Sequence, residues 1–250
     1  MTSALEISTP QEPARMAVCL DIDDTLLDNE RASRGGLRAL TGNDAAWPMW
    51  RRLTEHHYAR FVAGRVDYDT MRWERTRAFF TAFGERLGDE EVLAREQMRM
   101  AAMQRCWSLF DDVLPCLENL RARGLRLAAV TNAAGEYQRR KIAAVGLGDV
   151  FDAIVISEEA RVAKPDPRIF ETACSALGLP AERVVHVGDR LDVDAGGAAR
   201  AGLRGVWLNR AGDAGTVPEG VSVITSLSEL PELMAWAPRP ILDERGSLVR

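Results

Sequence analysis

Three acidic residues stand close together near the start of the chain. Asp21, Asp23 and Asp24 lie in the stretch LDIDDTL, directly after the apolar run MAVC. Such a run is typical of a buried strand, where a charged side chain is costly unless it is paired or bound to a metal. The stretch therefore indicates that cations share a pocket with these carboxylates.

Other polar side chains follow later apolar runs in the same manner. They are Thr131, Asn132, Lys164, Asp189 and Asp194. Ligands of a parallel α/β sheet bind beyond the carboxyl ends of its strands, so we expect these side chains to meet the first acids at one sheet edge. The set combines carboxylates, a hydroxyl, an amide and an ammonium, a mixture suited to phosphoryl transfer assisted by Mg²⁺.

The acidic residues have the chemistry of a Mg²⁺ site. This ion prefers hard oxygen ligands and is usually held by one or two carboxylates together with substrate phosphate oxygens. We expect Asp21 and Asp189 to bind it directly, with Asp194 just behind them or acting through a water. An alternative for Asp189 is a helix N-cap, a frequent role of aspartate that is compatible with metal binding.

The spacing of the first acids separates their roles. Residues two apart beyond the last hydrogen bond of a strand can lean toward the same pocket. Asp21, nearest the strand end, is placed as the nucleophile, and Asp23 as the general acid that protonates a leaving alkoxide and later deprotonates water. Asp24 is assigned to solvent or to local hydrogen bonds in the turn.

The remaining polar residues are expected to bind the phosphoryl group. Thr131 and Lys164 would contact its oxygens, with the lysine acting as a positive charge against both phosphate and acids. Asn132 either contacts the same group or shapes its loop. The structural alternatives are a helix cap for Thr131 and an ordinary surface position for Lys164.

The chain from residue 125 onward alternates apolar runs with helical patterns. Strands are predicted at 16–22, 125–130, 151–157, 183–188 and 205–209, and helices at 135–146, 167–178 and, shorter, at 192–202. Strands separated by helices predict a parallel sheet covered on both faces. The expected fold class is α/β with a Rossmann-like parallel sheet and a helical domain inserted after the first strand.

Residues 30–110 interrupt this alternation. They contain no good strand run, and apolar residues such as Met98, Ala102, Cys106 and Leu109 recur at helical spacing. We expect a helical domain at 30–110 and an α/β core domain made of 16–29 and 111–237. The flanking segments 1–15 and 238–250 are expected to be loose tails.

Composition limits the class of protein. Hydrophobic residues make up 46% and charged residues 28%, which is ordinary for a globular protein, and the net charge of −5 argues against binding to nucleic acid polymers or anionic membranes. The N-terminus lacks a basic start followed by an apolar segment, and no window is long enough to span a membrane. The cysteines are scattered among apolar residues and indicate a reducing compartment. A cytoplasmic location is expected.

The histidines favour structural roles. His186 lies inside the apolar run VVHVG and is expected to be a core histidine whose hydrogen bonds are satisfied. His56 and His57 are neighbours in a helical pattern, so they would point to different faces. We expect neither to contact the substrate.

Four segments, in this order, resemble the motifs of the haloacid dehalogenase-like hydrolase superfamily. They are DIDDT at 21–25, Thr131 with Asn132, Lys164 with Pro165, and GDRLDVD at 188–194. The resemblance implies that Asp21 forms an aspartyl-phosphate and that Asp23 is the acid and base, with a backbone carbonyl that also meets Mg²⁺. It implies that Asp189 and Asp194 form the acidic metal motif, and that the insert is a cap that closes over the site and selects substrates.

Asp23 points to phosphatases within this superfamily. Members that cleave carbon–halogen bonds lack an acid at this position, because a halide needs no proton whereas an alkoxide does. The segments TNAAGEYQRRKIAAVGL, KPDPRIF and DAGGAARAGLRGVWLN resemble the branch with N-acylneuraminate-9-phosphatase-like and pyrimidine-nucleotidase-like members. Ala133 departs from the glycine that is frequent there, and Val193 from an asparagine.

The sequence thus predicts a Mg²⁺-dependent phosphomonoesterase that acts on a small phosphorylated metabolite. Sugar phosphates, acidic sugar phosphates and nucleoside monophosphates all stay open, as does the oligomeric state. One alternative is a phosphomutase or phosphotransferase of the same fold. Another is a binding module without turnover, which would be expected to lack Asp21, Asp23 or Lys164, and none of these is missing.

Overall fold

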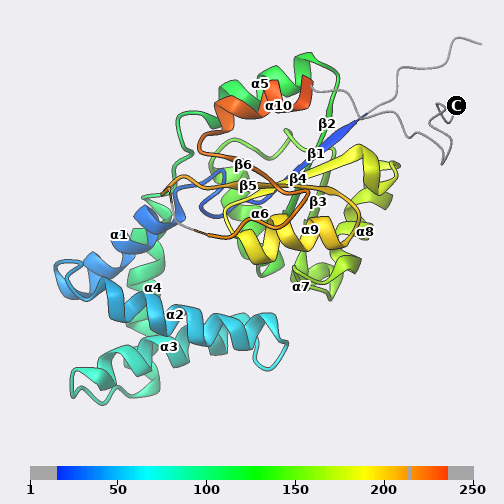
Figure 1. The fold of residues 1–250 in the computed structure, drawn as a ribbon. Helices are drawn as coiled ribbons and strands as arrows, with labels where there is room; N and C mark the ends of the chain where they lie inside the picture. The colour runs from blue at the N-terminus through cyan, green and yellow to red at the C-terminus, as the bar shows by residue number, and fades with distance from the viewer. Residues whose placement is uncertain (1–15, 213–214, 236–250) are drawn as a thin grey trace, which may run out of the picture.

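The computed structural model describes residues 16–212 and 215–235 (Figure 1). The tails predicted at 1–15 and 238–250 lie outside the described residues, as do the last two residues of the predicted core segment. Among the helices in the described ranges, none is both long enough and apolar enough to cross a membrane.

The centre of the molecule is a parallel sheet of six strands. Its order is β3-β2-β1-β4-β5-β6, and every neighbouring pair is parallel. The strands are β1 (Ala17–Leu20), β2 (Arg126–Thr131), β3 (Ala153–Ile156), β4 (Val184–Gly188), β5 (Arg204–Leu208) and β6 (Ser222–Ile224). The predicted α/β fold with a Rossmann-like sheet is confirmed. The short edge strand β6 was not predicted, since three residues do not make a recognisable apolar run.

The register of the central strands explains where a site can form. Leu20, the last residue of β1, lies opposite Ala129 of β2 and Val187 of β4. The strand order runs one way from β1 to β3 and the other way from β4 to β6, so the reversal falls between β1 and β4. The segments that leave β1, β2 and β4 therefore emerge side by side at the switch point of the sheet.

Helices cover both faces of the sheet (Figure 1). They are α5 (Val113–Ala122), α6 (Gly135–Ala144), α7 (Ser157–Ala160), α8 (Pro167–Leu177), α9 (Gly196–Arg200) and α10 (Leu230–Ala235). Alternation along β1 divides the core, because Val18 and Leu20 belong to the cluster with α5 and α10, whereas Ala17 and Cys19 belong to the cluster with α8 and α9. The sheet is thus buried between two helical layers, as predicted.

Between β1 and α5 the chain forms four helices. They are α1 (Asn29–Thr41), α2 (Trp47–Val62), α3 (Tyr68–Ala82) and α4 (Asp89–Gln104). These helices enclose their own aromatic cluster, in which Leu37, Trp50, Phe79 and Phe80 are buried. The insert is helical as expected, and its treatment as a separate domain with bounds 30–110 stays a prediction.

The buried face of α4 carries charged as well as apolar residues. Met98 is 54% exposed, whereas Ala102, four positions later in the same helix, is buried. The buried residues of α4 are Val92, Glu96, Arg99, Met100, Ala102 and Met103. An apolar pattern alone does not reveal this face, because the paired charges of Glu96 and Arg99 lie in its middle.

Local sequence signals account for the helix ends. Asp28, Asp67 and Asp166 are the N-caps of α1, α3 and α8, and each side chain accepts a hydrogen bond from a backbone N–H of the first turn. Gly42 and Gly178 end α1 and α8 with positive φ, a conformation that glycine adopts without strain.

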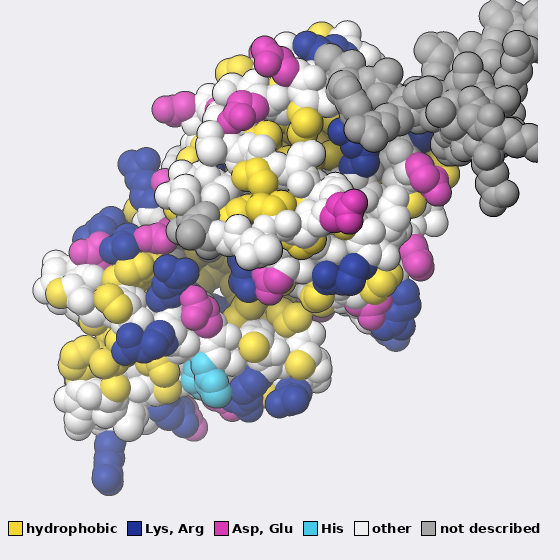
Figure 2. Space-filling model, in the orientation of Figure 1, with side chains coloured by type: hydrophobic (Ala, Val, Ile, Leu, Met, Phe, Trp, Pro, Cys, Tyr) yellow, Lys and Arg dark blue, Asp and Glu magenta, His cyan; other side chains and the backbone are white. Residues whose placement is uncertain are grey.

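On the face shown in Figure 2, acidic and basic side chains are interspersed, so that face carries no large patch of one sign.

Candidate active site

The acids of the first stretch lie in a tight loop after β1. Asp21 continues the strand direction, since its backbone N–H donates to the Val187 carbonyl at 2.9 Å. The chain then turns at Asp24, which has a φ of 59°. The Asp24 Oδ1 atom accepts a hydrogen bond from the backbone N–H of Glu30 at 2.8 Å. Asp24 thus makes the local turn contact that was expected of it.

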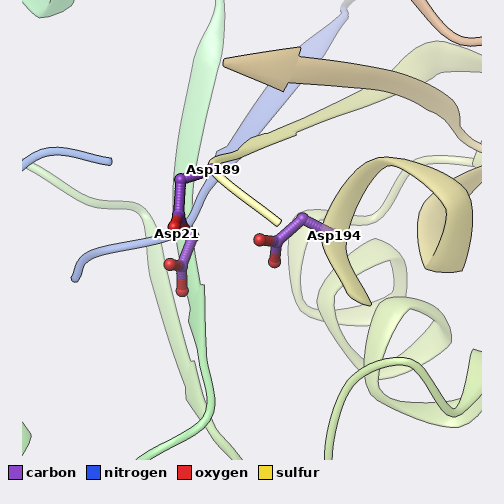
Figure 3. Close-up of side chains that lie close together, drawn as sticks. All are labelled: Asp21, Asp189 and Asp194. Carbon is purple, nitrogen blue, oxygen red and sulfur yellow. The ribbon is translucent and has the colours of Figure 1, made fainter. Parts of the chain in front are cut away.

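Three carboxylates converge at the switch point of the sheet. Asp21 follows β1, Asp189 follows β4, and Asp194 lies in the π-helical turn 191–195. Each offers one oxygen, and these oxygens all lie within 4.8 Å of one another. Figure 3 shows the Asp194 carboxylate pointing toward the other two from its separate turn. Residues that are more than 160 positions apart therefore share one small volume.

Lys164 lies among these acids. Its Nζ is 2.6 Å from Asp21 Oδ1 and 2.6 Å from Asp194 Oδ1. Burial alone would favour a neutral lysine, but the charges of Asp194 and Asp21 raise the pKa of Lys164. Burial opposes ionisation of Asp194 as well, yet Lys164 and the bond to His186 hold the pKa of Asp194 well below its usual range. The pair Lys164–Asp194 is therefore a buried ion pair.

One lysine does not balance three carboxylates. Burial raises the pKa of Asp21 against the effect of Lys164, and it raises the pKa of Asp189, which also faces the charges of Asp21 and Asp194. Ionisation of all three acids would thus leave more negative charge than Lys164 can balance, and the cluster offers only carboxylate oxygens. This donor set fits a hard divalent cation such as Mg²⁺.

Asp194 is held in place from several sides. Its Oδ2 accepts a hydrogen bond from the Arg190 backbone N–H at 3.0 Å, and its Oδ1 lies 3.3 Å from His186 Nε2. His186 is fully buried, and burial lowers its pKa, so the neutral ring is favoured. The core position expected for His186 is observed, but its hydrogen bonds are not all satisfied: Nε2 contacts Asp194, whereas the buried Nδ1 has no partner among the described residues. These contacts hold both oxygens of the Asp194 carboxylate, and whether Asp194 binds a metal directly or through water stays a prediction.

Asn132 and Lys164 fasten two loops together. The Asn132 Nδ2 donates to the Lys164 carbonyl at 2.9 Å, and the Lys164 backbone N–H donates to Asn132 Oδ1 at 2.8 Å. The Asn132 side chain is thereby used to shape the loop, which was one of its two predicted roles. Contact with a phosphoryl group stays a prediction for Asn132 and for Thr131.

Two residues that the sequence analysis did not identify contact Asp23. Lys141 Nζ lies 2.6 Å from Asp23 Oδ1, and Gln138 Nε2 donates to Asp23 Oδ2 at 3.1 Å. Gln138 Nε2 also lies 3.1 Å from Thr131 Oγ1. Residues 138 and 141 are three apart on α6, which begins shortly after β2, so their common face was a usable signal.

The helical insert reaches the site through Tyr58 of α2. Its hydroxyl donates to the backbone carbonyl of Asn132. His57 is buried beside it in the same helix and His56 is exposed, so the two histidines face different directions, as predicted. The insert therefore contacts the loop that follows β2, which Asn132 in turn ties to Lys164.

The chain is similar in sequence to known phosphatases. The chain is 38% identical over 236 residues to glyceraldehyde 3-phosphate phosphatase of Methanopyrus kandleri, covering 91% of this chain and 95% of the relative. It is 31% identical over 243 residues to mouse (Mus musculus) N-acylneuraminate-9-phosphatase, covering 87% of this chain and 93% of the relative. The second relative confirms the predicted resemblance to the branch with N-acylneuraminate-9-phosphatase-like members.

The fold is shared with solved structures. The magnesium-bound HAD-hydrolase YfnB of Bacillus subtilis matches with a TM-score of 0.74 and 24% identity, over 89% of this chain and 99% of that chain. This likeness concerns the arrangement of sheet and helices. The sequence pattern of the haloacid dehalogenase-like hydrolases matches residues 16–202. Because this pattern covers most of the chain and the relatives above match nearly their full length, the chain belongs to the haloacid dehalogenase-like hydrolase family.

Proposed function

We propose that this protein is a Mg²⁺-dependent phosphomonoesterase that hydrolyses a small organic phosphate through an aspartyl-phosphate on Asp21. The observation that carries the proposal is the pairing of Asp21 with Lys164 beside a cluster of carboxylates that fits a divalent cation. Relatives that are named as phosphatases of small metabolites support the same reaction class.

The proposed first step is attack of Asp21 on phosphorus. Lys164 binds Oδ1 of Asp21, which leaves the Oδ2 atom for the attack. The P–O bond to the leaving group breaks as the bond from phosphorus to the Asp21 oxygen forms. Asp23 gives its proton to the departing alkoxide, which leaves as an alcohol. Thr131 and Lys164 are proposed to bind the oxygens of the transferring group.

The proposed second step returns the enzyme to its starting state. Asp23, now a carboxylate, takes a proton from water, and the resulting hydroxide attacks the phosphorus of the aspartyl-phosphate. The P–O bond to Asp21 breaks, and inorganic phosphate leaves. One residue can serve in both steps because the alkoxide leaves from the side of phosphorus opposite Asp21, and the water later enters on that same side.

Asp21, Asp189 and Asp194 would hold Mg²⁺, as their shared volume and their carboxylate oxygens fit this ion. When bound, the ion supplies positive charge that stabilises the phosphoryl oxygens in the transition state. The contact of the Asp23 carbonyl with the ion remains part of the proposal. Without such a cation, the excess of buried carboxylates would repel an anionic substrate.

Helices α1–α4 are proposed to act as the cap. Their contact with the site through Tyr58 and Asn132 supports this role. A closed cap excludes all water except the attacking molecule and favours hydrolysis of a bound ester over side reactions. The cap side chains would also select the substrate, for which sugar phosphates and nucleoside monophosphates are the proposed classes. A cytoplasmic location fits such a substrate.

The test is a phosphate-release screen over a broad panel of phosphorylated metabolites with Mg²⁺. We expect release from at least one ester, no release in chelator, and labelling of the protein by substrate phosphate. A phosphomutase would instead retain the phosphoryl group and need a bisphosphate activator. A binding module would bind the ester with no turnover. Transfer to an organic acceptor without phosphate release would contradict the proposed hydrolysis.

A further inference from the structure

The chain contains only two lysines among its 32 lysine and arginine residues, and both contact acids of the candidate site. Lys164 pairs with Asp21 and belongs to the motifs discussed above. Lys141 lies on α6 and pairs with Asp23 at 2.6 Å. In a protein whose other long basic side chains are all arginine, the second lysine also lies next to a carboxylate that the proposed reaction uses.

We infer that Lys141 and Gln138 are positioning residues for Asp23, which hold its carboxyl group toward the leaving-group oxygen. The inference rests on the proposed function and extends it to side chains outside the motifs. Lys141 binds Oδ1 of Asp23 and Gln138 binds Oδ2, so each oxygen of the carboxylate has one fixed partner. Because both oxygens are bound, the orientation of the Asp23 carboxylate plane is fixed.

This arrangement leaves Asp23 able to react. A carboxylate oxygen has two lone pairs, so one hydrogen bond on each oxygen leaves room for a leaving-group oxygen or a water. The Asp23 side chain is 28% exposed, whereas that of Lys141 is 2% exposed. The lysine therefore supports Asp23 from the protein side, and the open side of Asp23 faces away from it.

The two supports are themselves held in place. Lys141 Nζ lies 4.9 Å from the centre of the Tyr137 ring, a cation–π contact on the same helix. Gln138 is fully buried and bonds Thr131 as well as Asp23. A single side chain thus ties the proposed acid to a residue proposed to bind the phosphoryl group. The position of Asp23 is coupled to the end of β2.

The type of residue at position 141 fits this role. An ammonium is a compact charge on a flexible stem, whereas a guanidinium is a planar group that binds carboxylates through two nitrogens. An arginine at position 141 would offer two nitrogens, and one of them would compete with Gln138 for Oδ2 of Asp23. Lysine occupies one oxygen only.

A purely structural role has a different signature. A buried lysine that only stabilises the fold would, when replaced, lower activity toward all substrates by one factor. A support for a general acid matters most where the leaving group needs a proton. Phenolates with electron-withdrawing groups depart without one, whereas alkoxides do not. The dependence of rate on the leaving group therefore separates the two roles.

The experiment compares kcat/KM for 4-nitrophenyl phosphate, phenyl phosphate and glycerol 2-phosphate in Mg²⁺. This constant reports the steps up to release of the alcohol, so the later hydrolysis of the aspartyl-phosphate does not enter it. The variants are Lys141→Met, Gln138→Leu and Lys141→Arg. Arg140→Met is the matched control, since it removes a positive charge from the next position of α6, where the side chain is 62% exposed.

For Lys141→Met we expect kcat/KM to fall about 100-fold with glycerol 2-phosphate and less than about threefold with 4-nitrophenyl phosphate, because a general acid contributes about 10²–10⁴-fold. Gln138→Leu should show the same selectivity with a smaller loss. Lys141→Arg should recover part of the activity toward glycerol 2-phosphate, and Arg140→Met should match the wild type with every ester.

Equal losses with all three esters, or no loss, would overturn the inference while leaving the proposed function intact. If Lys141→Met does not fold, as judged by its circular dichroism, Gln138→Leu and Lys141→Arg decide the question. The deciding quantity is again the ratio of kcat/KM for glycerol 2-phosphate to kcat/KM for 4-nitrophenyl phosphate. A wild-type protein that releases phosphate from none of the esters, nor from any metabolite in the screen, would overturn the proposed function and this inference with it.

Discussion

Gly188 and Asp194 lie so close that no side chain fits at position 188. A Cβ atom built on Gly188 would come 2.3 Å from Asp194 Cγ and 2.5 Å from Asp194 Cβ. Asp194 cannot simply move away, because Lys164 and the Arg190 backbone hold its two oxygens. The glycine at the end of β4 is thus a condition for the buried ion pair beside Asp21.

Replacing Gly188 by alanine is therefore expected to displace Asp194 and with it Lys164. We predict that Gly188→Ala lowers kcat at least about tenfold, because small displacements of positioned groups cost large factors in rate. Steady-state phosphate release measures this effect. Gly148→Ala is the control, since a Cβ there meets only Ala143 Cα at 3.9 Å. Equal activity of the two variants would contradict the steric argument.

Asp21→Asn is expected to abolish turnover, because an amide is a poor nucleophile toward phosphorus. We predict a loss of about 10⁴-fold or more in kcat, the order seen when other covalent enzymes lose their nucleophile. Acid quenching of the wild type during turnover with ³²P-labelled substrate should trap label on the protein, and the variant should carry none. The exposed Asp149→Asn serves as control, and label retained by Asp21→Asn would refute the assignment of the nucleophile.

Mg²⁺ is expected to stabilise the folded protein as well as support activity, because it neutralises the carboxylates of Asp21, Asp189 and Asp194. Mg²⁺ at a hundred times its Kd would add about 2.7 kcal/mol to the free energy of unfolding. The measurement is the Tm by calorimetry in chelator and in Mg²⁺. Asp189→Asn should shrink the shift, whereas Asp192→Asn, at an exposed acid of the neighbouring turn, should retain it. A wild-type Tm that is indifferent to Mg²⁺ would speak against a metal site here.

The insert contains a buried ion cluster around Glu96. Its carboxylate accepts hydrogen bonds from Arg75, Arg99 and Thr76, and its side chain is 1% exposed. Glu96→Gln leaves two buried guanidinium groups without their counter-charge, so we predict a loss of about 3–5 kcal/mol in the free energy of unfolding. Urea denaturation measures it. The matched change Glu55→Gln removes an exposed partner of Arg51 and should cost less than about 1 kcal/mol.

The same cluster predicts a pH dependence of stability. Burial would raise the pKa of Glu96, but Arg99 and Arg75 overcome it and lower the pKa to about 2, from 4.5. A depressed carboxylate pKa stabilises the fold above 4.5, and this contribution is lost as the pH falls toward 2. The difference in unfolding free energy between wild type and Glu96→Gln should therefore be constant from pH 7 to 5 and shrink below pH 4.5. A difference that stays constant down to pH 3 would exclude Glu96 as its source.

Much of the site could be predicted because its residues follow strands. The run before Asp21 and the run before Asp189 are continuous and apolar, and the ends of parallel strands meet at one edge wherever the helices between them lie. The same reasoning placed Thr131 at that edge. It could not detect β6, whose three residues carry too little pattern, or the buried face of α4, which carries charged residues.

The order of strands and motifs in the sequence by itself determined the fold class and the set of acids and cations at the sheet edge. Only the tertiary structure decided which of these groups touch: that Lys164 pairs with Asp21 and Asp194, and that Lys141, 118 positions from Asp23, supports it. The physical reason is that the sequence pattern depends on neighbouring residues, whereas a tertiary contact depends on how distant elements pack. Hydrophobic periodicity is local and reports burial, whereas a contact of 2.6 Å depends on how α6 is rotated and packed against the loop after β1.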